Sequence, residues 1–432
     1  MGIEPTLAAW EAAVLPLNYT RGAVNLPVPP PSGKGRGTGL RFRWSDLDCG
    51  SDHGGGYRVR ASWVWGALLA TLVAADTVHA AGGARPAADW RPIVSPAQQV
   101  FPALLIATAN LRAPAGQPPD GVLGDPHGMV GVALAATRDG QRARVSIEAP
   151  GLGAPSSIEV VLPRAGDWYQ VYPTMRWDFA RLQDQRRAAP ATIEFAVEVD
   201  GHPASRRVQR VRLRAVNEAP YSIDDDGRRT DLSWMFAAYV DEEHPLVQRI
   251  LGEALAAGHV DRFDGYQSGD PQQVYRQVFA VWQVLARHGM RYSSIARTSA
   301  AQDAVLSQYV RFLDESWENR QANCVDGAVL LASVLRRIDL DVQLVLVPGH
   351  MFLAFDLAPG GERAYLETTR LGDVAGKAGQ GALLHNFQQA VEEGLARHAQ
   401  AQDRFGRADA PEYRIIDIDA ARRLGVAPIA VR

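Results

Sequence analysis

The pattern of apolar and polar positions divides the chain into two parts. Between Gln98 and Ala219, apolar residues alternate with polar ones in short runs rich in Val, Ile, Thr and aromatic residues, and turn clusters such as RDGQ and PGLGAPS separate most of the runs. Such spacing is typical of a sandwich, in which two sheets bury their alternating apolar side chains between them. We therefore predict an all-β sandwich over residues 85–216, with VFPALLIATANLR (residues 100–112) as one of its strands.

From Trp234 onward the period becomes helical. The stretches WMFAAYV, HPLVQRILGEALAAG and QQVYRQVFAVWQVLARHG each place apolar residues at i, i+3, i+4 and i+7, and Gly258 and Gly289 suit helix C-caps. Strand-like runs follow further on, so we predict an α+β domain over residues 232–432. The polar segment NEAPYSIDDDGRRTD, residues 217–231, is predicted as a solvated linker between the two domains.

Several elements are predicted in the later part of this domain. VQLVLVPG is a buried strand that MFLAFDL continues, and RAYLETT returns as its hairpin partner. Leu383–Gly394 predicts another helix, and Tyr413–Asp419 predicts a last strand followed by a helical turn.

The first eighty residues look unlike the start of a fold. Residues 1–58 are rich in Pro and Gly and have no sustained apolar period. Their opening, MGIEPTLAAWEAAVLPLNYTR, resembles the spurious peptides produced when a bacterial reading frame runs across a transfer-RNA gene. We therefore expect residues 1–58 to be disordered or not part of the real protein.

Residues 59–80 match a secretory signal peptide. A basic start, about fifteen apolar residues at Ala61–Ala75, and small residues before a cut after Ala80 fit this signal. The apolar run is short of the roughly twenty residues that span a membrane. We expect an exported protein, periplasmic or secreted, with no stable membrane span, or a membrane-anchored one if the signal stays uncleaved. A buried core helix is the alternative interpretation.

Composition narrows the function classes. A formal net charge of -3 over 432 residues gives no electrostatic reason to expect a nucleic-acid partner. The two cysteines, Cys49 and Cys324, lie far apart without any CxxC pair, so neither a disulfide scaffold nor a Cys-rich zinc site is predicted, and no cofactor is expected. Once the signal is removed, Cys324 is a solitary thiol in an oxidising compartment, which suggests a chemical role.

Four aromatic residues lie close together in the predicted sandwich: Trp168, Tyr169, Tyr172 and Trp177. Such a group can form a carbohydrate-binding platform. Core packing is the commoner role for aromatic residues in a sandwich, and we favour it here.

The stretch Glu318–Arg370 contains the residues with chemical potential. Asn323 suits an N-cap and Asp326 suits position N3, so a helix is expected to begin at Cys324. A thiol in the first turn lies beside unpaired backbone N–H groups and the positive end of the helix dipole, which favour the thiolate. The same N–H groups can receive an oxyanion when the thiolate attacks a carbonyl group.

A histidine and an acid follow at suitable positions. His350 comes directly after Gly349 on the predicted strand, and the returning strand places Glu367 within about three residues of the position opposite it. Cys, His and a carboxylate in this order can form a nucleophile, a general base and an orienting acid. Each also has a simpler interpretation: Cys324 as a small buried apolar residue, His350 as a core or turn histidine, and Glu367 as a solvated edge carboxylate.

Together these features resemble a known family. Cys324 at a helix start, PGHMF around His350 and the acid on the next strand resemble the transglutaminase-like core of the papain-type cysteine enzymes, over about Tyr292–Leu371. The resemblance implies that Cys324 is the nucleophile, that His350 is the general base and acid, and that Glu367 is the third residue, where the family usually has Asp. Asp356 is the alternative acid, and Gln321 is the first candidate for an oxyanion side chain.

The strand pattern and the resemblance together predict an immunoglobulin-like sandwich followed by a transglutaminase-like domain. The expected reaction is acyl transfer on amide or isopeptide bonds of a protein or peptide, cell-envelope material among them, through a thioester on Cys324. Hydrolysis is expected ahead of cross-linking. A catalytically silent binding or scaffold module is the alternative, and a metal site of Cys324 and His350 lacks further ligands.

Overall fold

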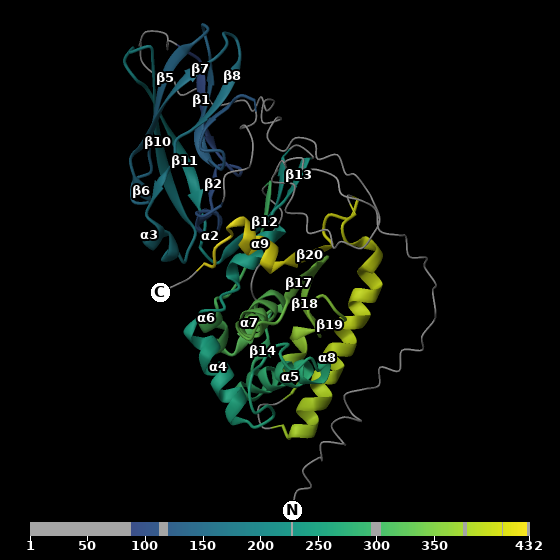
Figure 1. The fold of residues 1–432 in the computed structure, drawn as a ribbon. Helices are drawn as coiled ribbons and strands as arrows, with labels where there is room; N and C mark the ends of the chain where they lie inside the picture. Colours follow the sequence, from purple (N-terminus) through teal and green to yellow (C-terminus); the bar gives the residue numbers. More distant parts are fainter. Residues whose placement is uncertain are drawn as a thin grey trace, which may run out of the picture. The chain divides into compact units, whose positions relative to one another are not determined.

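The structure is a computed structural model that describes residues 88–111, 120–225, 228–294, 304–374, 378–407 and 409–429. Residues 1–58 and the predicted signal peptide at 59–80 lie outside the described residues. Within the described ranges, no helix is both long and apolar enough to cross a membrane. The fold is of the mixed α+β class, with strands dominating residues 88–213 and helices more frequent after residue 232 (Figure 1).

Two larger sheets and a small ribbon make up the N-terminal β-region, residues 88–213. The four-stranded sheet has the order β1 (Trp90–Val94), β4 (Val130–Ala135), β8 (Trp168–Tyr172), β3 (Val122–Gly124). The five-stranded sheet has the order β2 (Gln99–Val100), β11 (Ser205–Leu213), β10 (Ala189–Val199), β5 (Gln141–Glu148), β7 (Ser156–Leu162). The ribbon pairs β6 (Gly153–Ala154) with β9 (Arg176–Trp177), and the short helix α3 (Phe179–Gln183) follows it.

Alternation along the strands builds the core of this region. In β10, Ile193, Phe195 and Val197 are buried while their neighbours are more exposed, as a sheet with one covered face requires. Tyr169 and Tyr172 are also buried, so these two members of the aromatic group belong to the core. Trp168 and Trp177 are only half-buried.

One predicted strand of this region is wrong. The apolar run at residues 100–112 forms the end of β2 and then the helix α2 (Pro102–Ala107), in which all six residues are buried. An uninterrupted apolar run fits a buried helix as well as a buried strand. Pro102 at the first helical position decides for the helix, because its fixed φ suits the first turn and its missing N–H is not needed there.

The predicted linker at residues 217–231 is also wrong as a solvated connector. It forms β12 (Glu218–Asp225) and β13 (Arg228–Asp231), and β12 pairs as well with β15 (Val305–Tyr309). Asn217 is fully buried and donates to the carbonyl oxygen of Val310 at 2.9 Å. Polar side chains form hydrogen bonds with one another across the hairpin; for example, Arg229 Nε donates to Ser222 Oγ at 2.8 Å. The polar composition of this segment was therefore compatible with paired strands.

The part of the chain after residue 232 surrounds a four-stranded sheet with helices. The sheet has the order β19 (Arg363–Leu366), β18 (His350–Asp356), β17 (Val342–Val347), β20 (Arg414–Asp417). The helical segments are η2 (Ser233–Tyr239), α4 (Pro245–Ala256), α5 (Pro271–His288), α6 (Leu313–Asn319), α7 (Cys324–Arg337), η3 (Thr368–Asp373), α8 (Gln380–Ala401), η4 (Gln402–Arg404) and α9 (Ile418–Leu424). Helix α7 packs against β17 and β18, and α8 lies along β19 (Figure 1). A short ribbon pairs β14 (Arg291–Tyr292) with β16 (Gln321–Ala322).

The expected helical segments are present here, although WMFAAYV forms the 3₁₀ helix η2 rather than an α-helix. The expected long strand is divided. Residues 342–356 form an antiparallel hairpin rather than one continuing strand, and Val347 pairs with His350. Pro348 and Gly349 make the turn, and Gly349 has a φ of 69°, a value that favours glycine. Both arms are apolar, so the break was invisible in the hydrophobic pattern.

Candidate active site

The start of helix α7 presents the thiol. Asn323 is the N-cap: its Oδ1 accepts from the backbone N–H of Asp326 at 2.9 Å, and Asp326 Oδ2 accepts in return from the N–H of Asn323 at 2.9 Å. This reciprocal box begins the helix at Cys324, as predicted. Residues Val325–Leu335 are buried, whereas Cys324 is half-buried, so the thiol lies at the partly exposed end of an otherwise buried helix.

Asp326 anchors this helix start to the chain before it. Its buried carboxylate accepts from the backbone N–H of Arg311 at 2.8 Å and pairs with the Arg311 guanidinium at 2.6 Å. Burial raises the pKa of Asp326, and the hydrogen bonds and the charge of Arg311 act against that effect. Asn323 and Asp326 therefore have the supporting positions expected for them.

A glycine brings the helix close to the segment after β19. A Cβ atom on Gly327 would lie 2.9 Å from Oγ1 and 3.1 Å from Cβ of Thr368, so only glycine permits this approach without a shift. Thr368 Oγ1 donates to the carbonyl oxygen of Cys324 at 3.4 Å. Helix α7 and η3 are thus held against one another at the residues that flank the thiol.

His350 and Glu367 are joined directly. His350 Nε2 lies 2.6 Å from Glu367 Oε2, a hydrogen bond between the first residue of β18 and the N-cap of η3. The Glu367 side chain is fully buried, and its Oε1 accepts from the N–H and the Oγ1 of Thr369 at 3.1 and 2.6 Å. Since Nε2 faces the carboxylate, Nδ1 is the ring nitrogen left for the thiol side.

The electrostatics favour a charged imidazole. Burial lowers the pKa of His350, but hydrogen bonds with the side chains of Cys324 and Glu367 and their negative charges outweigh it and raise the pKa to about 9. Burial raises the pKa of Glu367, and the His350 ring and Thr369 more than offset this, so the pKa of that carboxyl lies below its ordinary value. His350 and Glu367 thus form an imidazole–carboxylate pair, and the Cys324 side chain lies near enough to the ring to help raise its pKa.

An arginine that the sequence did not suggest lies behind the acid. Arg397 Nε on α8 is 2.8 Å from Glu367 Oε2, an ion pair whose N–H is not aligned for a hydrogen bond. Arg397 Nη2 also contacts Glu393 at 2.7 Å, and Glu393 in turn pairs with Arg370 at 2.6 Å. These contacts fix α8 against the buried carboxylate. The spacing from Glu367 to Arg397 gives no signal in the sequence, because the contact depends on how α8 packs.

A tyrosine at the edge of the site was also missed. Tyr292 pairs with Ala322 in the β14–β16 ribbon and is 49% exposed. Burial of part of the ring and the negative charges of Cys324 and Glu367 raise the pKa of its hydroxyl, which locates the phenol near both groups. A lone tyrosine in a two-residue strand has no distinguishing pattern, so only the fold identifies it.

The remaining predicted residues lie at different places. Gln321 is exposed on β16, three residues before Cys324. Asp356 stands at the opposite end of β18 from His350, and its Oδ1 accepts from Arg363 Nε at 2.6 Å, so it is committed to that pair. In the part of the chain that the structure describes, no hydrogen bond engages the backbone N–H groups of Cys324 and Val325, so these first-turn donors are the candidates for binding an oxyanion.

Comparison with known proteins does not assign the chain to a family. A scan against models of protein families finds no match, and a search of curated proteins finds no relative. In the described part of the chain, no group of three or more His, Cys, Asp or Glu side chains is arranged to hold a metal ion.

Proposed function

We propose that the protein is an exported, transglutaminase-like cysteine enzyme that cleaves amide or isopeptide bonds through a thioester on Cys324. One observation supports the proposal above the others: the His350 ring is hydrogen-bonded to the buried Glu367 carboxylate, and the nearby Cys324 and Glu367 side chains together raise the pKa of that ring. A histidine that only filled space in the core would need neither partner. A thiol made nucleophilic by an imidazole, with a carboxylate behind the imidazole, is the arrangement for covalent catalysis at a carbonyl group.

The acylation step uses the charged pair. The Cys324 thiolate attacks the carbonyl carbon of the amide, and a C–S bond forms as the carbonyl oxygen becomes an oxyanion. The N–H groups of Cys324 and Val325 at the start of α7 are suited to receive this charge. The imidazolium of His350 then donates its proton to the leaving nitrogen, the C–N bond breaks, and the amine departs. Cys324 now holds the acyl group as a thioester.

The deacylation step reverses the proton flow. Neutral His350 accepts a proton from water as the water oxygen attacks the thioester carbon, and collapse of the oxyanion breaks the C–S bond. The proton on His350 and the thiolate on Cys324 are thereby restored, and a carboxylic acid is released. An amine in place of water would give a new amide. Hydrolysis is the first activity to test, because water needs no second binding site.

Two parallel assays test the proposal. The full chain is incubated with fluorescently labelled casein, and peptide release is measured; a second sample contains a dansylated primary amine, and its incorporation into casein is measured. Cys324→Ser and His350→Ala serve as inactive controls. In the same proteins, peptide mass spectrometry follows the rate of Cys324 alkylation by iodoacetamide, separately from that of Cys49.

The expected result is a reactive Cys324 near neutral pH that His350→Ala slows, together with release of peptides that both substitutions abolish. Alkylation of Cys324 at equal rates in the wild type and in His350→Ala would overturn the proposal. Such a thiol would instead favour the binding-module interpretation.

A further inference from the structure

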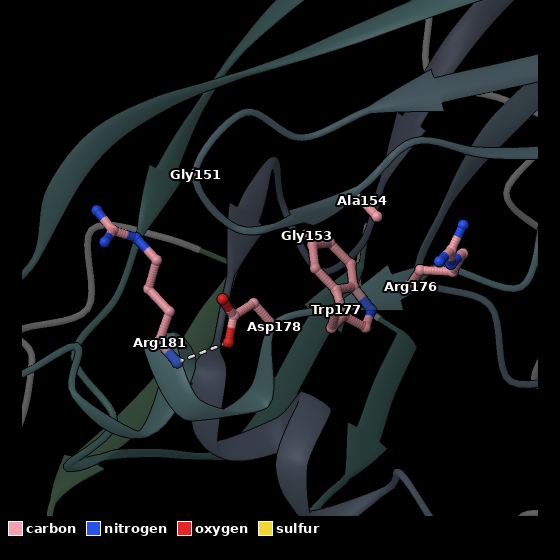
Figure 2. A pocket seen from close by; sticks show the side chains of 7 residues that line it. All are labelled: Gly151, Gly153, Ala154, Arg176, Trp177, Asp178 and Arg181. Carbon is pink, nitrogen blue, oxygen red and sulfur yellow. Dashed lines mark hydrogen bonds between the residues drawn. The ribbon is translucent and has the colours of Figure 1, made fainter.

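A shallow, solvent-open hollow of about 530 Å³ lies in the N-terminal β-region, on elements that do not include the Cys324 triad. The loop Gly151–Ala154 forms one side and the segment Arg176–Arg181 forms the other, across the β6–β9 ribbon. Figure 2 shows the indole of Trp177 near the centre of this hollow, with Arg176 and Arg181 on opposite sides. The core aromatic residues of the region, Tyr169 and Tyr172, take no part in it.

Glycine keeps one side of the hollow open. Gly153 pairs with Trp177, and a Cβ atom there would lie 2.4 Å from the carbonyl oxygen of Arg176 and 3.1 Å from Cα of Trp177. The ribbon therefore requires glycine at this position, and no side chain of residue 153 covers the indole. The half-buried Trp177 ring is left as a flat apolar surface that a ligand can reach.

The charged groups of the hollow are uncommitted. Arg176 and Arg181 are exposed, and in the described part of the chain neither guanidinium has an ion-pair or hydrogen-bond partner. Asp178 Oδ1 accepts from the backbone N–H of Arg181 at 3.1 Å, which leaves the second oxygen open (Figure 2). The lining thus combines two cations, one carboxylate acceptor and one aromatic face, with an excess of positive charge.

We propose that this hollow binds an acidic glycan through a carboxylate-bearing pyranose residue. The apolar C–H face of a pyranose ring can lie on the Trp177 indole. A guanidinium fork binds a carboxylate through two parallel N–H···O bonds, so Arg176 or Arg181 selects the acidic sugar. Asp178 can accept a hydrogen bond from a ring hydroxyl. A neutral sugar would leave both guanidinium groups unused, and a small carboxylate alone would leave the indole unused. This inference does not depend on the chemistry proposed for Cys324.

Native affinity electrophoresis tests this inference on the full chain. The gels contain polygalacturonate, neutral dextran, or polyglutamate at a carboxylate concentration that matches the polygalacturonate. Because the chain has a formal net charge of -3, its overall charge does not attract it to a polyanion. We expect polygalacturonate alone to retard the wild type.

Two variants of the hollow and one matched control complete the design. Trp177→Ala and the double variant Arg176→Gln/Arg181→Gln should each weaken retardation at least about tenfold in apparent Kd. The control is Arg206→Gln/Arg210→Gln, which removes the same charge from two exposed positions on β11. It should bind as the wild type does. An unchanged circular-dichroism spectrum and an unchanged denaturant midpoint show that each variant is folded.

Three outcomes would overturn the inference. The wild type could pass through polygalacturonate unretarded. The β11 control could lose as much retardation as the hollow variants, which would indicate diffuse attraction between charges. Polyglutamate could retard the wild type as strongly as polygalacturonate, and the hollow would then be a site for acidic peptides.

Discussion

Replacing Glu367 with Gln measures how far the buried carboxylate stabilises the charged form of His350. The pKa of His350 is about 9, against 6.5 for an ordinary histidine, even though burial of the ring acts in the opposite direction. Cys324 and Glu367 together must therefore account for a rise of roughly 2.5 pH units or more, which corresponds to about 3 kcal/mol in favour of the imidazolium. If the carboxylate supplies about half of this, Glu367→Gln should lower the pKa of His350 to roughly 8.

The direction of the pH dependence follows from this rise. A histidine whose pKa is raised by folding stabilises the folded protein fully below its ordinary pKa, and this stabilisation is lost as the pH rises through about 9. In the proposed mechanism, the imidazolium that donates a proton to the leaving nitrogen disappears over the same range, so acylation should decline above about pH 9 in the wild type. In Glu367→Gln the decline should begin about one pH unit lower.

NMR titration of histidine labelled with ¹³C at Cε1 reads out this pKa directly. The resonance missing from His350→Ala identifies the ring, and its midpoint is compared between the wild type and Glu367→Gln. Glu362→Gln, which changes an exposed carboxylate in the turn before β19, should leave the midpoint in place. A midpoint that is the same in Glu367→Gln and in the wild type would refute the reasoning, because the 2.6 Å contact would then contribute nothing to the charge on the ring.

Three further substitutions test the surroundings of the site. Gly327→Ala should lower the free energy of unfolding by about 1–3 kcal/mol in a denaturant titration, because its Cβ would lie 2.9 Å from Thr368 Oγ1. The control Gly252→Ala has no atom within 4 Å of its Cβ and should leave stability unchanged or raise it. Similar values for the two variants would contradict the close approach at Gly327. Asp326→Ala should lower the free energy of unfolding by about 3–5 kcal/mol in the same assay, because it leaves Arg311 without its buried partner. The control Glu318→Ala changes an exposed carboxylate and should have almost no effect. A small loss in Asp326→Ala would argue that the Asp326–Arg311 pair does not anchor the start of α7. Tyr292→Ala should raise KM for a peptide substrate more than it lowers kcat, since the phenol stands at the edge of the site, and a fall in kcat alone would exclude a role in binding.

The start of α7 was predictable because its determinants are local. Asn323 and Asp326 are three residues apart, and the side chain of each accepts a hydrogen bond from the backbone N–H of the other. This short sequence pattern is therefore enough to predict where the helix begins. The approach of Glu367 to His350 followed from the return of a neighbouring strand, where Leu353 pairs with Leu366 and the next residues stay close. Contacts between residues this close in the chain can be predicted from the sequence.

Other features depended on packing that no short segment reveals. The contact between Arg397 and Glu367 needs the whole of α8 to lie along β19. The hairpin turn at Pro348 and Gly349 was missed because apolar residues on both arms hid the break, although a Pro-Gly pair is itself a turn signal. The polar composition of residues 217–231 suggested solvent, but β12 obtains partners from β13 and from β15, about eighty residues away in the chain.

The position of β20 affects when the site can form during synthesis. The strand completes the sheet beside β17, and Arg414 at its start pairs with Asp231 at 2.5 Å, although β20 is made after α8 and long after the residues of the triad. A nascent chain that already contains Cys324, His350 and Glu367 still lacks one strand of the sheet that supports His350. If Cys324 is the nucleophile proposed above, its thiol is expected to gain full reactivity late, when nearly all of the described chain has been made, which would limit premature reaction with neighbouring proteins.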